Sequence, residues 1–126
     1  MRTDLKVMVV DDEDPVRKTL TRFLRSLGLQ NILEASNGQE AIALAEANPD
    51  IQLILLDLKM PVQDGIQALT EIRPVLPKAK IVILTGYPFY GDADMLVQQG
   101  KVVDFIVKPV DLDYLENILR TLLPLD

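Results

Sequence analysis

The feature that most constrains the fold is an apolar run that ends in a carboxylate, residues 51–57, with the sequence Ile-Gln-Leu-Ile-Leu-Leu-Asp. A nearly continuous apolar run of this length is typical of a strand buried on both faces, which in a small protein usually lies at the centre of a parallel sheet. Asp57 then lies at the carboxyl edge of the sheet, where open α/β folds bind their ligands. Because a buried carboxylate without a purpose is costly, we expect Asp57 to be functional.

Four further short runs have strand character, and helical patterns separate them. The strands are expected at Val7–Val10, Ile32–Ala35, Ile81–Leu84 and Val102–Val107. The first helix is expected from Pro15 to a glycine cap at Gly28, and the second from the Asn37–Glu40 capping box to Asn48 and Pro49. A third is expected around Ile66, Leu69 and Ile72, with an early end at Pro74 and Pro77. The last two are expected around Asp92–Gln99 and from near Asp111 to Leu122. This alternation predicts a doubly wound parallel sheet with right-handed crossovers.

Composition limits the class of protein. With 126 residues we expect one domain, spanning 1–126, and the lack of any apolar run near twenty residues predicts a soluble, cytoplasmic protein that does not contact membranes. The net charge of −6 argues against direct nucleic-acid binding. Since the chain has neither Cys nor His, thiol catalysis, Ser-His-Asp catalysis and the usual zinc sites are excluded, and any chemistry must use carboxylates, Lys and hydroxyls.

Polar residues follow four of the predicted strands, and all parallel strands end at one edge of the sheet. These residues are Asp11, Asp12, Asp57, Thr85 and Lys108. If strand one lies beside strand three, two carboxylates ~5 Å apart repel by roughly 3 kcal/mol at an effective dielectric of about 20. Three carboxylates therefore need a cationic partner, and oxygen ligands of this kind suit Mg²⁺ or Mn²⁺, with Lys108 neutralising part of the remaining charge.

All of these residues except Asp57 also have an ordinary structural interpretation. Asp11, Asp12 and Asp14 could cap the first helix, and this is the better account of Asp14. Thr85 alone is typical of a strand end, and Lys108 alone is typical of a solvated surface. It is the combination of residues at four strand ends that favours a functional site.

Over its whole length the chain resembles the receiver domain of two-component response regulators. The residues that carry the resemblance are the acidic pair Asp11 and Asp12, the phosphoacceptor Asp57, the loop Met60-Pro61 with Asp64-Gly65, the switch hydroxyl Thr85, the switch aromatic Phe105, and Lys108 followed by Pro109. The resemblance implies a five-stranded sheet in the flavodoxin-like order 2-1-3-4-5, with helices on both faces. It also implies a cis peptide bond between Lys108 and Pro109.

By this resemblance, Asp57 takes a phosphoryl group from a phosphohistidine on a sensor histidine kinase or a phosphotransfer protein. The resemblance implies Mg²⁺ (or Mn²⁺) held by Asp12, Asp57 and the Lys59 backbone carbonyl, with Asp11 acting largely through a metal-bound water. Thr85 and Lys108 would then contact the phosphoryl oxygens.

The switch aromatic, Phe105, would turn inward into the space that Thr85 vacates. The surface of the fourth and fifth helices with the fifth strand would carry the signal to a downstream protein or an attached output domain. The chain would be a monomer or a phosphorylation-dependent dimer.

Two positions depart from the pattern. Lys59 and Tyr87 flank the route of the water that hydrolyses the acyl phosphate in this family, and their bulk predicts slow self-dephosphorylation. The aromatic residues Tyr87, Phe89 and Tyr90 form either an interface or a cover for the sheet edge.

Two other functions use similar residues. A metal-dependent hydrolase that forms an aspartyl phosphate commonly has a second carboxylate two residues after the nucleophile, but this chain has Lys59 there, so we do not expect an enzyme. A receiver-like docking module that never takes phosphate would be recognised by the loss of one of the key residues. All five key residues are present, so this function ranks second. Met1 slightly favours a natural start, but the sequence leaves open whether the chain stands alone or was cut from a longer protein.

Overall fold

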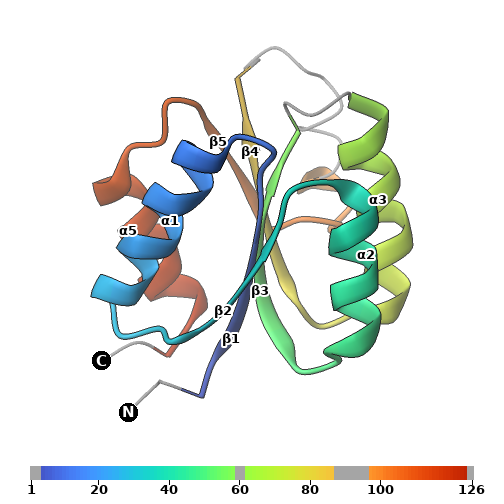
Figure 1. Ribbon diagram of the computed structural model, residues 1–126, viewed down its shortest axis with the longest axis horizontal. Helices are drawn as coiled ribbons and strands as arrows, with labels where there is room; N and C mark the ends of the chain where they lie inside the picture. Colours follow the sequence, from blue (N-terminus) through green and yellow to red (C-terminus); the bar gives the residue numbers. More distant parts are fainter. Residues whose placement is uncertain (1–3, 59–61, 87–96, 125–126) are drawn as a thin grey trace.

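The computed structural model contains a five-stranded parallel sheet. It describes residues 4–58, 62–86 and 97–124, and for residues 62–66 it describes the backbone only. The strand order β2-β1-β3-β4-β5 confirms the predicted order and puts the apolar run 51–57 at its centre (Figure 1). The strands are β1 (Lys6–Val10), β2 (Asn31–Ala35), β3 (Ile51–Asp57), β4 (Lys80–Thr85) and β5 (Asp104–Val107).

Helices cover both faces of this sheet. On one face lie α1 (Asp14–Ser26) and α5 (Leu112–Leu122), and on the other lie α2 (Gly38–Ala47) and α3 (Val62–Val75) (Figure 1). This arrangement confirms the doubly wound fold. The helix expected around Asp92–Gln99 falls largely outside the described residues. None of the helices in the described ranges is both long enough and apolar enough to cross a bilayer.

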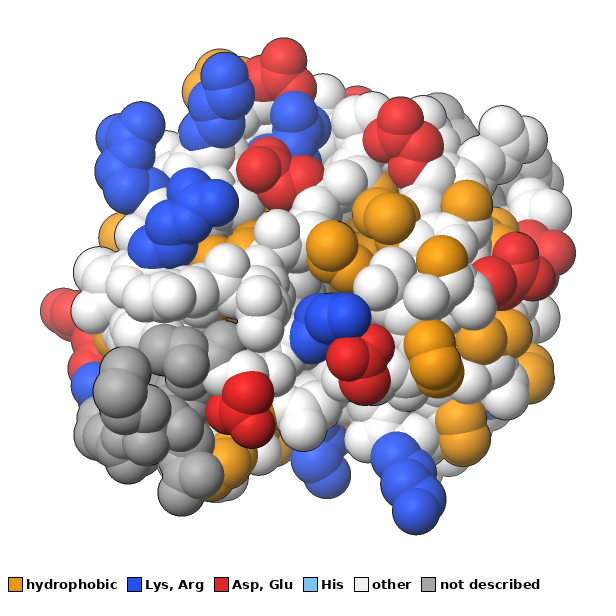
Figure 2. Space-filling view, turned by 60° about the horizontal axis from the view of Figure 1, so that its bottom comes forward, with side chains coloured by type: hydrophobic (Ala, Val, Ile, Leu, Met, Phe, Trp, Pro, Cys, Tyr) orange, Lys and Arg blue, Asp and Glu red, His pale blue; other side chains and the backbone are white. Residues whose placement is uncertain are grey.

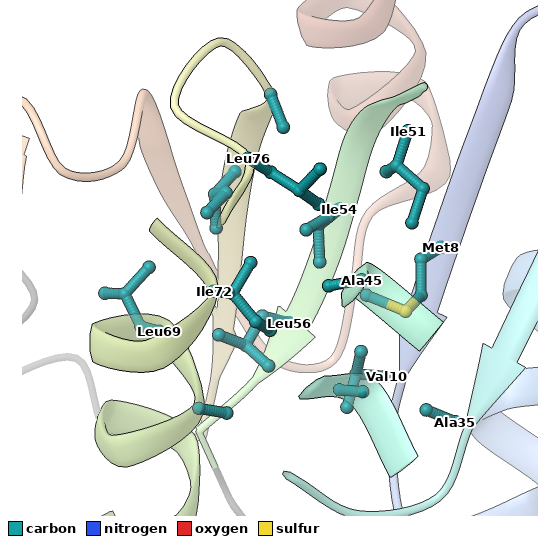
Figure 3. Close-up of a cluster of buried hydrophobic side chains, with 14 of the residues drawn as sticks. Met8, Val10, Ala35, Ala45, Ile51, Ile54, Leu56, Leu69, Ile72 and Leu76 are labelled. Carbon is teal, nitrogen blue, oxygen red and sulfur yellow. The ribbon is translucent and has the colours of Figure 1, made fainter. Parts of the chain in front are cut away.

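The core has two layers because successive strand residues point to opposite faces of the sheet. Met8, Ile54 and Leu56 point towards α2 and α3, where Leu69 and Ile72 are fully buried against them (Figure 3). The intervening strand residues pack against α1 and α5; they are Val7, Val9, Leu53, Leu55, Val82 and Leu84. The central strand β3 is therefore buried on both faces, which holds its C-terminal residue in a fixed place.

The predicted caps of α1 and α2 are present, with one difference. Gly28 has a φ of 95°, and its N–H and that of Leu29 donate to carbonyls of the last turn of α1, which is a Schellman motif. At the start of α2, the Asn37 side chain accepts from the Glu40 N–H. The Glu40 carboxylate, however, accepts from the N–H and hydroxyl of Ser36 rather than from Asn37, so the capping box is shifted by one residue.

Two predicted boundaries were wrong. Pro74 does not end α3 early, because it lies in the last turn, where its missing N–H removes a single helical hydrogen bond. The fifth strand begins at Asp104 rather than at Val102, although the Val103 N–H already donates to the Ile81 carbonyl. Both errors concern the ends of elements and leave the strand order unchanged.

Candidate functional site

The site is built where β1 and β3 end side by side. Val10 pairs with Leu56, so the next residues along each strand, Asp11 and Asp57, lie opposite each other at the carboxyl edge of the sheet. Both carboxylates are fully buried. The ladder continues past β3, since the Leu58 N–H donates to the Leu84 carbonyl over 2.8 Å. Paired strands thus hold Asp57 from both sides.

Four carboxylates meet at this edge. One oxygen from each of Asp11, Asp12, Glu13 and Asp57 lies within 4.8 Å of the others. Asp12 is exposed and Glu13 is half-buried, so the cluster opens to solvent on the loop side. The sequence predicted the three aspartates but missed Glu13, although its place directly after the acidic pair was the available signal.

Lys108 supplies the positive charge. Its Nζ lies 2.9 Å from Asp11 Oδ2, 3.2 Å from Asp57 Oδ1 and 3.7 Å from Glu13 Oε1. Burial would lower the pKa of Lys108, but its hydrogen bond to Asp11 and the charge of Asp57 outweigh burial and raise that pKa above its ordinary value. The ammonium group is therefore charged at neutral pH, and within the described part of the chain this one ammonium group faces four carboxylates.

The predicted switch residues lie on the neighbouring strands. Thr85 is the last residue of β4 and is almost completely buried. Its carbonyl accepts from the Lys108 N–H over 2.6 Å, which ties the backbone of the lysine to that of the hydroxyl residue. Phe105 lies on β5, is half-buried and packs against the core layer beneath α2 and α3.

Arg17, in the second turn of α1, is a second cation near the site that the sequence did not reveal. Its Nη1 donates to the Asp11 carbonyl over 2.7 Å, its Nε donates to Glu34 Oε1 over 3.0 Å, and its Nη2 pairs with Asp14. Burial lowers the pKa of Arg17, but the two carboxylates outweigh it, and the net pKa is raised. Nothing in the spacing of the sequence distinguishes this arginine from the others on α1.

The capping interpretation of the acidic run fits only in part. The N-cap of α1 is Glu13, whose side chain makes no capping hydrogen bond, and Asp14 lies inside the first turn. Asp11 Oδ1 accepts from the Glu13 N–H over 2.8 Å, which shapes the loop before the helix. The acidic pair therefore faces the cluster at the sheet edge, while Asp14 interacts with α1.

Some predictions concern residues outside the described ranges. Lys59 and its backbone carbonyl belong to this group, as does the aromatic loop with Tyr87, Phe89 and Tyr90. The cis peptide bond between Lys108 and Pro109 is confirmed.

The donor set fits a hard divalent cation. Four carboxylate groups within 4.8 Å of one another offer only oxygen atoms, which are the ligands that Mg²⁺ and Mn²⁺ prefer. Among the described residues, Asp12 and Asp57 offer the ligands that the sequence predicted, with Asp11 and Glu13 beside them. Since Lys108 leaves the cluster with excess negative charge, binding a cation is electrostatically favourable.

Comparison with known proteins agrees with this geometry. The family described as the response regulator receiver domain matches residues 7–120. Regulatory protein AtoC of Escherichia coli is 35% identical over 121 residues, which cover 95% of this chain and 25% of AtoC. The chain therefore spans about a quarter of this relative.

Solved structures of response regulators have a fold similar to that of this chain. A response regulator protein from Burkholderia pseudomallei, determined with a phosphorylated aspartic acid, calcium ion and citrate, has a TM-score of 0.80 at 30% identity over 95% of this chain and 67% of that one. The CheX-CheY complex from Borrelia burgdorferi with BeF₃ and Mg²⁺ has a TM-score of 0.83 at 28% identity over 94% of this chain and 90% of that one.

Proposed function

This chain is a member of the response regulator receiver family of two-component signalling, and on that premise we propose that it is a phosphorylation-dependent switch with Asp57 as its phosphoacceptor. One observation carries the proposal. The buried Asp57 carboxylate lies at the end of the central strand, 3.2 Å from the Lys108 ammonium group and among three other carboxylates. We propose a signalling module that stores a phosphoryl group rather than an enzyme that turns over a substrate.

The proposed reaction is an in-line transfer. An oxygen of Asp57 attacks the phosphorus of a phosphohistidine, the new P–O bond forms as the P–N bond breaks, and the imidazole nitrogen of the donor leaves with the electron pair. Lys108 is charged and its Nζ lies 3.2 Å from Asp57 Oδ1, so it can stabilise the negative charge on the transferred oxygens. The Asp57 oxygen that attacks is a carboxylate oxygen of the cluster, whose negative charge the Lys108 ammonium group partly offsets.

The transfer also requires a divalent cation, for which we propose Mg²⁺ or Mn²⁺ held by Asp12, Asp57 and the Lys59 backbone carbonyl, with Asp11 nearby. When bound, the cation supplies positive charge for the equatorial oxygens of the phosphoryl group. The support for this proposal is the all-oxygen donor set and its excess negative charge.

We propose that phosphorylation changes Thr85 and Phe105 and, through them, the surface formed by β5, α5 and the fourth helix. The residues expected to form the fourth helix are mostly outside the described ranges. The hydroxyl of Thr85 would move towards the phosphoryl group and Phe105 would turn inward. On this surface Val103, Val107 and Tyr114 are exposed, which supports its use by a downstream protein, an attached output domain or a second copy of the chain. The cytoplasmic location stays a prediction.

The proposed donor is a sensor histidine kinase or a phosphotransfer protein, which must approach the edge that holds Asp57. An apolar groove of about 310 Å³ lies beside Lys108, between α1 and the start of α5, and includes Val16, Pro109 and Leu112. Lys and Arg side chains gather at the upper left of Figure 2, over α1, where Lys18, Arg22 and Arg25 are exposed. These features support docking of a protein with apolar and acidic side chains.

The test of phosphorylation is intact mass after incubation with a small phosphodonor and Mg²⁺. We expect the wild type and Asp113→Asn, which changes an exposed carboxylate on α5, to gain one phosphoryl group, and Asp57→Asn to gain none. A wild type that binds Mg²⁺ but gains no mass would favour the phosphorylation-independent docking module.

The lifetime of the phosphoryl group tests the proposed role of Lys59 and Tyr87. If both side chains obstruct the hydrolytic water, truncating both to Ala shortens the lifetime, which is measured as loss of the added mass over time. A longer lifetime in the double variant would contradict this role and leave the assignment of Asp57 unaffected.

A further inference from the structure

Arg17 links three elements around the backbone of the acidic pair. It lies on α1, donates to the Asp11 carbonyl at the end of β1 over 2.7 Å, and donates to Glu34 on β2 over 3.0 Å, while it also pairs with Asp14. Only 12% of its side chain is exposed. A planar guanidinium group with several fixed donors is suited to hold such partners in one geometry.

Both the N–H and the carbonyl of Asp11 are held by hydrogen bonds. The Asp11 N–H donates to the Ala35 carbonyl over 3.1 Å, and the Asp11 carbonyl accepts from Arg17. The Asp11 carboxylate in turn accepts from the Glu13 N–H and from Lys108. The peptide between Asp11 and Asp12 therefore cannot rotate without breaking the contact with Arg17, and its orientation determines where the Asp12 carboxylate points.

The contact of Arg17 with the site differs in kind from that of Lys108. Lys108 contacts the carboxylates of the cluster directly, whereas Arg17 contacts a backbone carbonyl and its charge is matched by Asp14 and Glu34. Arg17 is therefore placed to orient the acidic loop and not to neutralise it.

We propose that Arg17 is a positioning residue for the divalent-cation site, and that its contact with the Asp11 carbonyl sets the affinity of that site. This inference rests on the proposed function, because it requires the acidic cluster to bind a cation. Partners that orient metal ligands from outside the coordination sphere typically change metal affinity by about tenfold or more when they are removed.

The test is a titration with Mn²⁺, with free Mn²⁺ measured by electron paramagnetic resonance. We compare wild type with Arg17→Lys and Arg17→Gln, and use Arg22→Lys and Arg22→Gln as controls, since Arg22 is an exposed arginine on the same helix. We expect both Arg17 variants to bind Mn²⁺ about tenfold more weakly and both Arg22 variants to bind as the wild type does. Arg17→Lys keeps the charge but not the planar group, so an effect of charge alone would be rescued by it.

A second variant keeps the inference testable if Arg17 variants fold poorly. Glu34→Gln leaves Arg17 in place but weakens its attachment to β2, and we expect a smaller loss of Mn²⁺ affinity in a protein whose urea unfolding is close to that of the wild type. In metal-free protein, we also expect the Glu13 amide to exchange with solvent faster in Arg17→Gln than in Arg22→Gln.

The outcomes separate the two proposals. If the wild type does not bind Mn²⁺, the proposed cation site is wrong, and the role of Arg17 is wrong with it. If the wild type binds Mn²⁺ and Arg17→Lys binds it equally well, the positioning role is overturned while the cation site stands.

Discussion

The two edges of the sheet treat charge in opposite ways. At the carboxyl edge, the described residues place one lysine, Lys108, opposite the carboxylates of Asp11, Asp12, Glu13 and Asp57. At the amino edge, Lys6 contacts Asn48 and Asp50, and Arg73 donates to the carbonyls of Leu76, Ala79 and Lys101.

Their difference indicates which edge is suited to bind a charged group from outside the chain. Among the described residues at the amino edge, Lys6 pairs with the Asp50 carboxylate, and Arg73 donates to three backbone carbonyls, although its Nε is buried without a hydrogen-bond partner. The charged groups at the carboxyl edge are left with excess negative charge, which a cation would neutralise. Stability measurements on both edges can test this contrast directly.

The largest effect is expected at the amino edge, for Arg73→Met. Arg73 lies in the last turn of α3 and joins that turn to the start of β4 and to the segment before β5. Removing it leaves three carbonyls without this donor, and we expect a loss of about 2–3 kcal/mol in the free energy of unfolding by urea. Arg25→Met is the matched control, because Arg25 lies in the last turn of α1 and is exposed. Equal effects of the two substitutions would remove the contrast.

Lys108→Met is expected to have the next largest effect, because it leaves Asp11 and Asp57 buried without their cation. We expect a loss of about 2 kcal/mol in chelator at neutral pH, since breaking a buried pair is costly but this cluster opens to water on one side. Mg²⁺ should reduce the difference in stability between wild type and Lys108→Met, because the cation replaces part of the lost positive charge. It should leave the difference between wild type and Arg73→Met unchanged, since both of these proteins keep the acidic cluster.

Comparison of wild type with Lys108→Met also gives a pH dependence of stability with a defined sign. Folding raises the pKa of Lys108 above its ordinary value of 10.5. The stabilisation by Lys108 is therefore fully present below about pH 10.5 and is lost as the pH rises through the folded-state pKa. The difference between wild type and Lys108→Met should shrink in that range, and a constant difference up to pH 12 would contradict the assignment.

Asp57→Asn should change stability in the opposite direction. Without metal it removes one of several repelling carboxylates, while Lys108 keeps Asp11 and Glu13 as partners, so we expect a net gain of about 1 kcal/mol in chelator. Stabilisation by Mg²⁺ should be much smaller in the variant than in the wild type. A loss of stability in chelator would show that the carboxyl edge is already satisfied.

The smallest effect is expected for Asp50→Asn. The hydrogen bond from Lys6 lowers the pKa of Asp50, but the carboxylate is well exposed, so urea midpoints at neutral pH should nearly coincide. Because folding lowers this pKa, any stabilisation is present above the ordinary value of 3.8 and disappears as the pH falls below it. A large difference at neutral pH would mean that surface pairs at the amino edge matter more than we infer.

Sequence patterns were sufficient to predict the sheet and the gathering of polar residues at one of its edges, because both depend on where strands end. Apolar runs located the strands, and parallel strands bring Asp11, Asp57, Thr85 and Lys108 to one edge whatever their separation along the chain. The end of α3 was missed because a proline in a last turn costs little.

Glu13 and Arg17 were missed for a different reason. Their contribution depends on how the loop between β1 and α1 directs the Glu13 side chain, and on how α1 brings the Arg17 side chain to the Asp11 carbonyl. Periodicity carries no information about either. Such contacts emerge only when the backbone of that loop is known.

The pairing of β3 with strands on both sides has a consequence for how a chemical change at its end could spread. Its neighbours β1 and β4 and the two helical layers leave the central strand no way to open except with the whole domain. Among the described strands, the four-residue β5 has a neighbour on one side only, and it is half-exposed in places. Displacement of the backbone is therefore easier in β5 than in β3, so Asp57 can keep a constant geometry while β5 moves.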